Sequence, residues 1–180
     1  MEIYLLDTNL ISGHLDLYHP WHEPVVEFVN QGSVDSDYLH ISCMAIAEIM
    51  FGYEVSLSQD PSRKQIVLDG LRQYRQVYRI DHHTVGCYYK IKANLFKDFG
   101  REQFGPKEFK KIVQLQPEEL CDRVTGKSLG IQEADLWMIA QAAEHDITFV
   151  TADSHSTKRV FDAAKKAFPD FKVLVLSKHN

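Results

Sequence analysis

The first 60 residues contain no lysine and no arginine, although they hold ten aspartate and glutamate residues. All 20 basic residues follow, together with 15 acidic ones, so the first third carries a formal charge of −10 and the remainder carries +5. Contacts with a polyanion are therefore expected in the second part of the chain. The asymmetry alone does not identify such a ligand, because most charged clusters are solvated helix faces.

Long apolar runs and cysteine pairs are also missing. No run approaches the roughly 20 residues of a membrane-spanning helix, and the N-terminus lacks the basic start and apolar core of a signal peptide. We therefore expect a soluble, cytoplasmic protein with no membrane partner. Cys43, Cys87 and Cys121 lie far apart, which excludes a C-x-x-C zinc or disulfide motif. With 44% hydrophobic residues, the 180-residue length suits a single domain over residues 1–180.

Short apolar segments alternate with longer helical patterns along the whole chain. The alternation predicts an α/β fold of three layers, α/β/α, with a central, mainly parallel sheet of roughly five strands. The expected strands cover residues 2–7, 39–42, 77–80, 147–150 and 172–176. The expected helices cover residues 21–30, 44–55, 61–76, 84–99, 106–122, 131–145 and 155–167. The polar stretch 98–129 has its own helical pattern and is expected to be an insertion.

Acidic residues follow two of the expected strands. Asp7 ends the apolar run of residues 3–6, and Asp153 follows ITFVT. A lone buried carboxylate is costly, so Asp7 either caps the next helix or belongs to a site. Ligands of open parallel sheets bind beyond the carboxyl ends of the strands, where both acids would lie. Two further acids, Glu48 in CMAIAEIMFG and Asp135 in EADLWMIAQA, lie in strongly apolar helical stretches, although the polar face of a helix could also hold them.

Four carboxylates at one strand edge would repel each other unless a cation lay among them. Mg²⁺ and Mn²⁺ prefer oxygen ligands and commonly share their coordination with a substrate phosphate. Such an ion activates a bound water and neutralises the charge that develops on an attacked phosphodiester. The four acids together therefore predict metal-assisted phosphoryl hydrolysis.

The motifs resemble those of the PIN-domain ribonucleases and, within them, the VapC-like toxins of type II toxin–antitoxin pairs. The resemblance runs almost from end to end through LLDTN, AIAEIMFG, SLGIQEADLWMIAQA and ITFVTADS. It implies a PIN-like fold and cleavage of single-stranded RNA by a metal-activated water. The residues implied as ligands of Mg²⁺ or Mn²⁺ are Asp7, Glu48, Asp135 and Asp153, and Thr151 is the hydroxyl that accompanies the last acid.

The resemblance also implies three partners, namely an RNA substrate, a cognate antitoxin and a second copy in a homodimer. Thr8 and Asn9 match a variant of the opening motif and are expected to orient Asp7 or to cap the short helix after it. Similar domains are usually shorter, so the stretch 98–129 is expected to form part of an RNA channel, a dimer contact or the seat of the antitoxin. The nine basic and six acidic residues over 90–127 favour RNA.

Alternative interpretations remain open at this point. A degenerate PIN scaffold would bind RNA or a protein without cutting, but the presence of all four acids argues against it. Glu133, two residues before Asp135, should point away from it on a helix, which leaves it a supporting or surface role. His14, His19 and His22 have no familiar zinc spacing, so a chance surface cluster is favoured over a zinc site.

Overall fold

The computed structural model describes residues 2–31, 38–55, 61–100, 109–122, 124–152 and 156–177. The contacts within the chain divide it into two compact units. The first unit consists of Met1–Arg79, Ile147–Ala152 and Lys172–Asn180, and the second consists of Ile80–Asp146 and Asp153–Phe171. That residues 1–180 act as a single domain stays a prediction.

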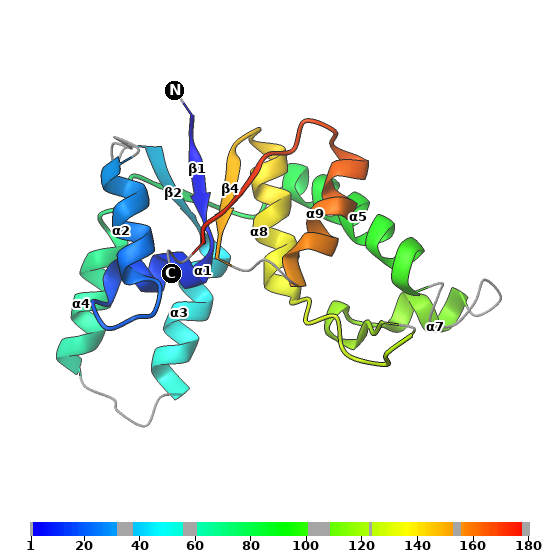
Figure 1. Ribbon diagram of the computed structural model, residues 1–180, viewed down its shortest axis with the longest axis horizontal. Coiled ribbons are helices and arrows are strands. Elements are labelled where there is room, and N and C mark those ends of the chain that lie inside the picture. Colours follow the sequence, from blue (N-terminus) through cyan, green and yellow to red (C-terminus); the bar gives the residue numbers. More distant parts are fainter. Residues whose placement is uncertain are drawn as a thin grey trace. The chain divides into compact units, whose positions relative to one another are not determined.

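The first unit contains a five-stranded sheet in the order β3-β2-β1-β4-β5 (Figure 1). Its strands are β1 (Tyr4–Leu6), β2 (Leu39–Ser42), β3 (Gln76–Tyr78), β4 (Thr148–Thr151) and β5 (Val173–Val175). Each neighbouring pair is parallel, and Leu5 of the central strand lies between His40 and Phe149. The side chains of β2 and β4 are buried throughout, as the apolar runs predicted. The α/β class and the five strands are therefore confirmed, and the sheet is entirely parallel.

Four helices belong to the same unit. They are α1 (Thr8–Leu15), α2 (His22–Gln31), α3 (Cys43–Val55) and α4 (Pro61–Leu71). Helix α1 packs against α2 and α3, and it also contacts β4. The close approach of α1 to the start of α2 requires Gly13, because a Cβ atom there would lie 3.0 Å from the Trp21 carbonyl carbon. Helix α4 ends earlier than predicted, since the chain needs residues 72–75 to turn into β3.

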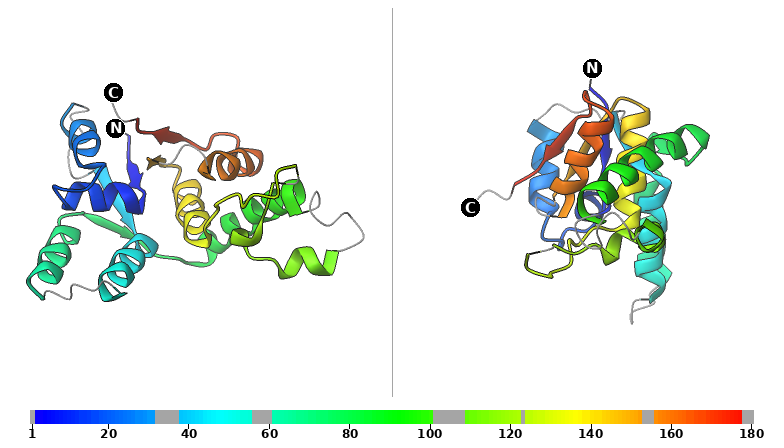
Figure 2. Two further views of the ribbon diagram at one scale, coloured as in Figure 1. Left: turned by 60° about the horizontal axis from the view of Figure 1, so that its bottom comes forward. Right: turned by 90° about the vertical axis from the view of Figure 1, so that its right-hand side faces the viewer.

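The second unit is mainly helical. Its elements are α5 (His82–Leu95), the π-helical turn η2 (Phe96–Gly100), α7 (Phe109–Gln114), the 3₁₀ turn η4 (Pro117–Glu119), α8 (Glu133–Glu144) and α9 (Ser156–Ala167). Helix α5 packs along both α8 and α9, and Figure 2 shows the three side by side. Buried apolar residues from all three helices, among them Ile91, Leu136 and Val160, form the core of this unit.

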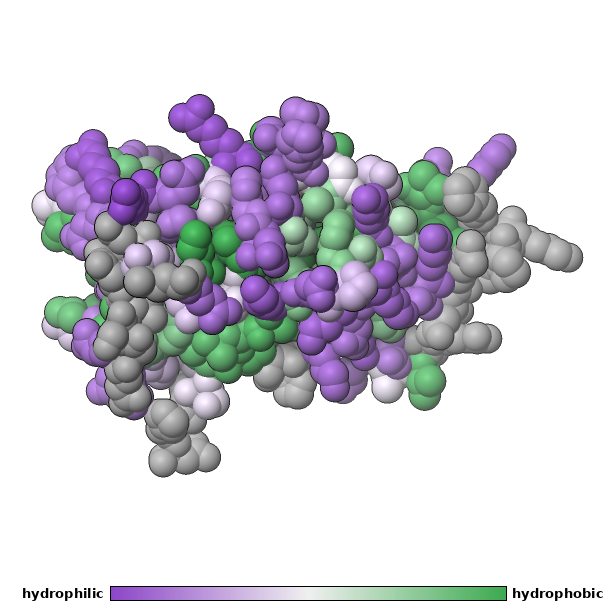
Figure 3. Space-filling view, turned by 90° about the horizontal axis from the view of Figure 1, so that it is seen from above, coloured by the Kyte–Doolittle hydropathy of each residue, from purple (hydrophilic) through white to green (hydrophobic). Residues whose placement is uncertain are grey.

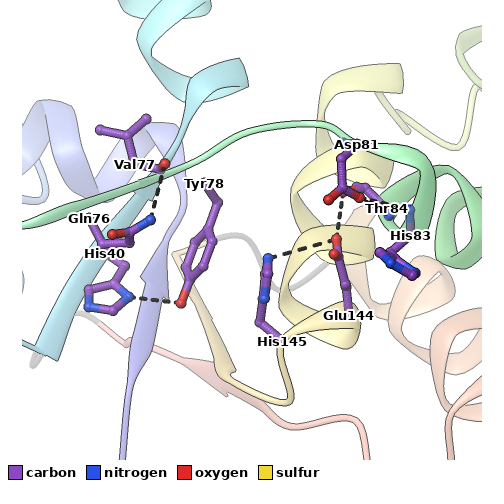
Figure 4. Close-up of polar contacts among 9 residues, drawn as sticks. All are labelled: His40, Gln76, Val77, Tyr78, Asp81, His83, Thr84, Glu144 and His145. Atoms are coloured by element: carbon purple, nitrogen blue, oxygen red, sulfur yellow. Dashed lines mark hydrogen bonds and ion pairs between the residues drawn. The ribbon is translucent and has the colours of Figure 1, made fainter.

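The start of α5 is fixed by a capping box (Figure 4). The Asp81 carboxylate accepts hydrogen bonds from the backbone amides of His83 at 2.7 Å and Thr84 at 3.1 Å. The Thr84 hydroxyl accepts from the Asp81 amide at 3.2 Å and donates to Glu144 of α8 at 2.5 Å. The cap therefore also ties α5 to α8.

The prediction of one helix over residues 106–122 is wrong for the part that the structure describes. Helix α7 covers only Phe109–Gln114, and Gln116 is extended with φ −90° and ψ 155°. The reason is Pro117, because a proline disfavours helical backbone in the residue before it. Beyond η4, Cys121 and Ser128 form an antiparallel bridge whose turn contains Gly126 at φ +66°. The described part of the stretch 98–129 is thus only partly helical.

The surface mixes polar residues with scattered apolar side chains. Figure 3 shows hydrophilic and hydrophobic residues interspersed on the face seen from above. Exposed large apolar residues occur in both units, for example Phe51 on α3 and Val113 on α7. Among the residues described, no helix is both long enough and apolar enough to cross a membrane.

Candidate active site

Asp7 lies at the carboxyl end of the central strand β1. Its backbone amide donates to the Val150 carbonyl at 2.9 Å, which keeps the residue against β4. Asp7 occupies the N-cap position of α1, but its side chain makes no capping hydrogen bond. Instead the carboxylate is only 5% exposed, and its Oδ2 accepts from the Thr151 hydroxyl at 2.6 Å. The side chain of Asp7 is therefore directed to the end of β4 and does not serve as a helix cap.

Glu48 is held at the start of α1. The Thr8 hydroxyl donates to Glu48 Oε2 at 2.5 Å, although the two residues are 40 positions apart. Glu48 lies on α3, which directly follows β2, the strand that pairs with β1. Two consecutive residues at the end of β1 therefore make carboxylate contacts. Asp7 supplies its own carboxylate, and Thr8 binds the carboxylate of Glu48. No sequence pattern predicted the contact between Thr8 and Glu48, because α3 meets α1 only through tertiary packing.

The two predicted ligands of the first unit, the Asp7 and Glu48 carboxylates, are oxygen donors, and a threonine hydroxyl contacts each of them. A carboxylate has about four acceptor positions, so one hydroxyl contact leaves it able to bind a cation as well. Oxygen donors of this kind are the ligands that Mg²⁺ and Mn²⁺ prefer.

The other two predicted ligands belong to the second unit. Asp135 lies in the first turn of α8 and is partly buried, and the positive end of a helix dipole favours a carboxylate at such a position. Asp153 lies outside the described residues. Within the described ranges, no three His, Cys, Asp or Glu side chains form a group that could hold a metal ion. That all four acids converge stays a prediction.

Glu133 shares the first turn of α8 with Asp135 but makes contacts within the helical unit. Its carboxylate accepts from the Tyr88 hydroxyl and pairs with the Lys92 ammonium at 3.0 Å. Burial raises the pKa of Glu133 and lowers the pKa of Lys92. Glu133 therefore helps to hold α8 against α5, which agrees with a supporting role.

The three histidines near the N-terminus have different partners. His14 Nδ1 forms a hydrogen bond with the Tyr74 hydroxyl at 2.8 Å, and His22 Nδ1 forms one with the Gly13 carbonyl at 2.8 Å. His19 Nδ1 accepts from a backbone amide at 3.3 Å. Burial, and after it the neighbouring His22, lowers the pKa of His14. Each of the three histidines thus has a hydrogen-bond partner of its own within the first unit.

A family model described as "PIN domain" matches residues 4–161. Among solved structures, the fold is similar to FitAcB from Neisseria gonorrhoeae, with a TM-score of 0.58 and 21% identity over 96% of each chain. It is also similar to DNA-bound VapBC from Salmonella typhimurium, with a TM-score of 0.59 and 19% identity over 97% of this chain and 98% of the other. VapBC-1 from nontypeable Haemophilus influenzae has a TM-score of 0.59 and 20% identity over 98% and 99%. A comparison with curated proteins found no match.

At identities this low, the solved structures establish similarity of fold alone. The family match is a separate finding, and it spans the four acids that the sequence motifs singled out. It also spans β1 to β4 and the first half of α9, so it includes parts of both compact units. The resemblance predicted from the motifs is therefore confirmed, and the chain belongs to the PIN-domain family.

Proposed function

We propose that this protein is a metal-dependent endoribonuclease that cleaves single-stranded RNA. The observation that carries the proposal is the position of Asp7, which is buried at the end of β1, makes no helix cap and accepts from Thr151. Membership in the PIN-domain family supports the same chemistry. The proposed ligands of Mg²⁺ or Mn²⁺ are Asp7, Glu48, Asp135 and Asp153.

The threonines of the first unit orient the carboxylates. The Thr151 hydroxyl donates to the Asp7 carboxylate and fixes its rotation. The Thr8 hydroxyl orients the Glu48 carboxylate in the same way. When bound, a divalent ion would activate the attacking water and neutralise the charge that develops on the phosphodiester. The protein's own contribution is a set of carboxylates that are already positioned before RNA binds.

Cleavage mapping on total cellular RNA with Mg²⁺ or Mn²⁺ tests the proposal. We expect the wild type to leave 5′-phosphate and 3′-hydroxyl ends. Asp7→Asn, Glu48→Gln, Asp135→Asn and Asp153→Asn should each abolish cleavage while the fold is retained, because each change removes a ligand charge but little volume. A wild type that binds RNA without cutting it in either metal would instead support the non-catalytic scaffold. Normal cleavage by Asp135→Asn would remove that acid from the ligand set.

We further propose that the protein is the toxin of a toxin–antitoxin pair, and that a cognate antitoxin and a second copy of the chain are its partners. The similarity of fold to VapBC and FitAcB supports this proposal. Expression of the wild type should arrest growth, and Asp7→Asn should not. Co-expression of the product of an adjacent gene should restore growth. Arrest by Asp7→Asn as strong as by the wild type would contradict a toxicity that depends on cleavage.

A further inference from the structure

A groove of about 330 Å³ lies between α5 and α7 in the second unit. We call it the α5–α7 groove. Its volume is in the range of small-molecule sites and is sufficient for a nucleobase. Aromatic, aliphatic and lysine side chains line it together, and they are Tyr88, Tyr89, Lys92, Ala93, Phe96, Lys97, Ile112 and Val113.

The two tyrosines of the groove differ in packing and exposure. Tyr88 is stacked on Trp137, with ring centroids 3.8 Å apart and planes 5° apart, and its hydroxyl contacts Glu133. Tyr89 is 57% exposed, and Val113 across the groove is 63% exposed. Tyr88 therefore belongs to the wall, whereas Tyr89 presents a ring to whatever enters. A flat, apolar ligand that covers the ring would remove this surface from water.

The groove also carries positive charge that no acid among the described residues neutralises. Lys97 lines the groove, and Lys110 lies on α7 three residues before Val113, which also lines it, so Lys110 and Val113 are neighbours on one helix face. Both side chains are exposed, and neither forms an ion pair with any residue in the described ranges. Lys92, in contrast, is paired with Glu133. An apolar surface between exposed lysines is complementary to a base with its flanking phosphates, because the base stacks while the phosphates meet the charges.

One lining residue of the groove contacts the end of α8 that carries a proposed metal ligand. Lys92 lines the groove, and its ammonium lies 3.0 Å from the Glu133 carboxylate. Glu133 and Asp135 occupy the same first turn of α8. A strand of RNA seated in the groove therefore passes close to the turn that holds Asp135.

We propose that the α5–α7 groove binds one unpaired base of single-stranded RNA by stacking on Tyr89, with Lys97 and Lys110 contacting the flanking phosphates. The inference rests on the proposed ribonuclease function and states where the substrate is held outside the acidic site. Only an unstacked base offers its face to a tyrosine, so the groove selects single strands over duplex RNA.

The test measures the binding of a labelled single-stranded RNA oligonucleotide to the full chain in EDTA, which prevents cleavage. Tyr89→Ala should weaken binding about fivefold or more. Fivefold is the smallest loss of affinity expected when one base loses its stacking partner. Tyr89→Phe should bind as the wild type does, since it retains the ring. Tyr18→Ala is the matched control because Tyr18 is 96% exposed in the other unit, and it should leave affinity unchanged.

A second measurement tests the lysines through salt dependence. The double variant Lys97→Gln/Lys110→Gln should lower the slope of log affinity against log salt by about 1.4, roughly 0.7 for each phosphate contact to a single strand. The control Lys127→Gln/Lys165→Gln removes two other exposed lysines and should not change the slope. Photocrosslinking of 4-thiouridine RNA should place Tyr89 or its neighbours among the labelled residues.

The outcomes separate the groove from the ribonuclease proposal. If the wild type cleaves RNA while the Tyr89 and lysine variants bind it normally, the groove proposal is overturned and the ribonuclease proposal stands. If the wild type neither binds nor cleaves RNA, both are overturned. If Tyr89→Ala changes sedimentation of the protein but not RNA affinity, the groove is a protein interface and the proposal is wrong.

Discussion

Two aspartates at the start of two helices have opposite surroundings. Asp81 precedes α5, is exposed and accepts from the backbone amides of Thr84 and His83, which lower its pKa (Figure 4). Asp7 precedes α1 with an extended backbone, φ −66° and ψ 154°, that suits a cap equally well. Its carboxylate is nevertheless buried and accepts from the Thr151 hydroxyl.

The difference follows from what precedes each residue. Asp81 follows a short exposed stretch, so only the amides of its own helix are available to it. Asp7 follows the central strand of a parallel sheet, so its side chain emerges beside the end of β4 and meets a residue 144 positions away. Because burial of a carboxylate is costly, Asp7 needs compensating interactions, for which we propose a metal ion beside the Thr151 hydroxyl, whereas the exposed Asp81 needs none. Four experiments sharpen or break this contrast.

The largest expected effect is on cleavage. Asp7→Asn should lower kcat/KM for RNA at least about 100-fold. Loss of a residue that hydrogen-bonds to a metal ligand typically lowers activity about 10- to 100-fold, and loss of the ligand itself should cost more. Asp81→Asn is the matched control at the other helix start and should cleave like the wild type. Equal activity of the two variants would show that Asp7 has no role in cleavage that Asp81 lacks.

The next effect is on thermal stability with and without metal. In EDTA, Asp7→Asn should melt at a higher temperature than the wild type, because the buried charge and its repulsion by other acids are removed. In Mn²⁺ the order should reverse, since the wild type gains about 2.7 kcal/mol at a hundredfold excess over Kd while the variant gains little. Asp81→Asn should respond to Mn²⁺ as the wild type does. Coincident melts of Asp7→Asn and the wild type, insensitive to metal, would contradict a metal site at Asp7.

A smaller effect is expected at the threonine that supports Asp7. Thr151→Val keeps the shape of the side chain but removes the hydroxyl, and it should reduce Mn²⁺ affinity or cleavage about 10- to 100-fold. Thr84→Val removes the corresponding hydroxyl beside Asp81 and should affect stability alone. Manganese titrations and kcat/KM for both variants provide the measurement. Wild-type values for Thr151→Val would show that the hydrogen bond to Asp7 has no functional role.

The smallest effect concerns the cap itself and its dependence on pH. The folded protein holds the pKa of Asp81 below its ordinary value of 3.8, mainly through the Thr84 amide, so the charged carboxylate stabilises the fold above that pH. The contribution is lost as the pH falls through the lowered pKa. Asp81→Ala should therefore melt below the wild type at pH 7, and the gap should close on acidification. A gap that stays constant down to pH 3 would contradict the cap.

The sequence was informative wherever the signal was local. All five strands appear near their expected positions, because a short apolar run between helical patterns is typical of a strand in a parallel sheet. Strands β2 and β4 are buried throughout, whereas the edge strands β3 and β5 are partly exposed. The position of Asp7 at the end of such a run, and the helices that carry Glu48 and Asp135, were likewise visible in the order of residues along the chain. One helix prediction was wrong for a reason that is also local. The pattern predicted a helix over residues 106–122, but Pro117 prevents helical backbone at Gln116.

Which groups meet across the sheet was decided by tertiary structure alone. The order β3-β2-β1-β4-β5 brings Thr151 to Asp7, and the packing of α3 on α1 brings Glu48 to Thr8. Such contacts depend on strand pairing and helix packing between distant segments, and residue periodicity carries no information about them. The sequence by itself thus determined that a carboxylate ends the central strand, and only the folded chain decided that a hydroxyl from β4, and not the helix start, receives it.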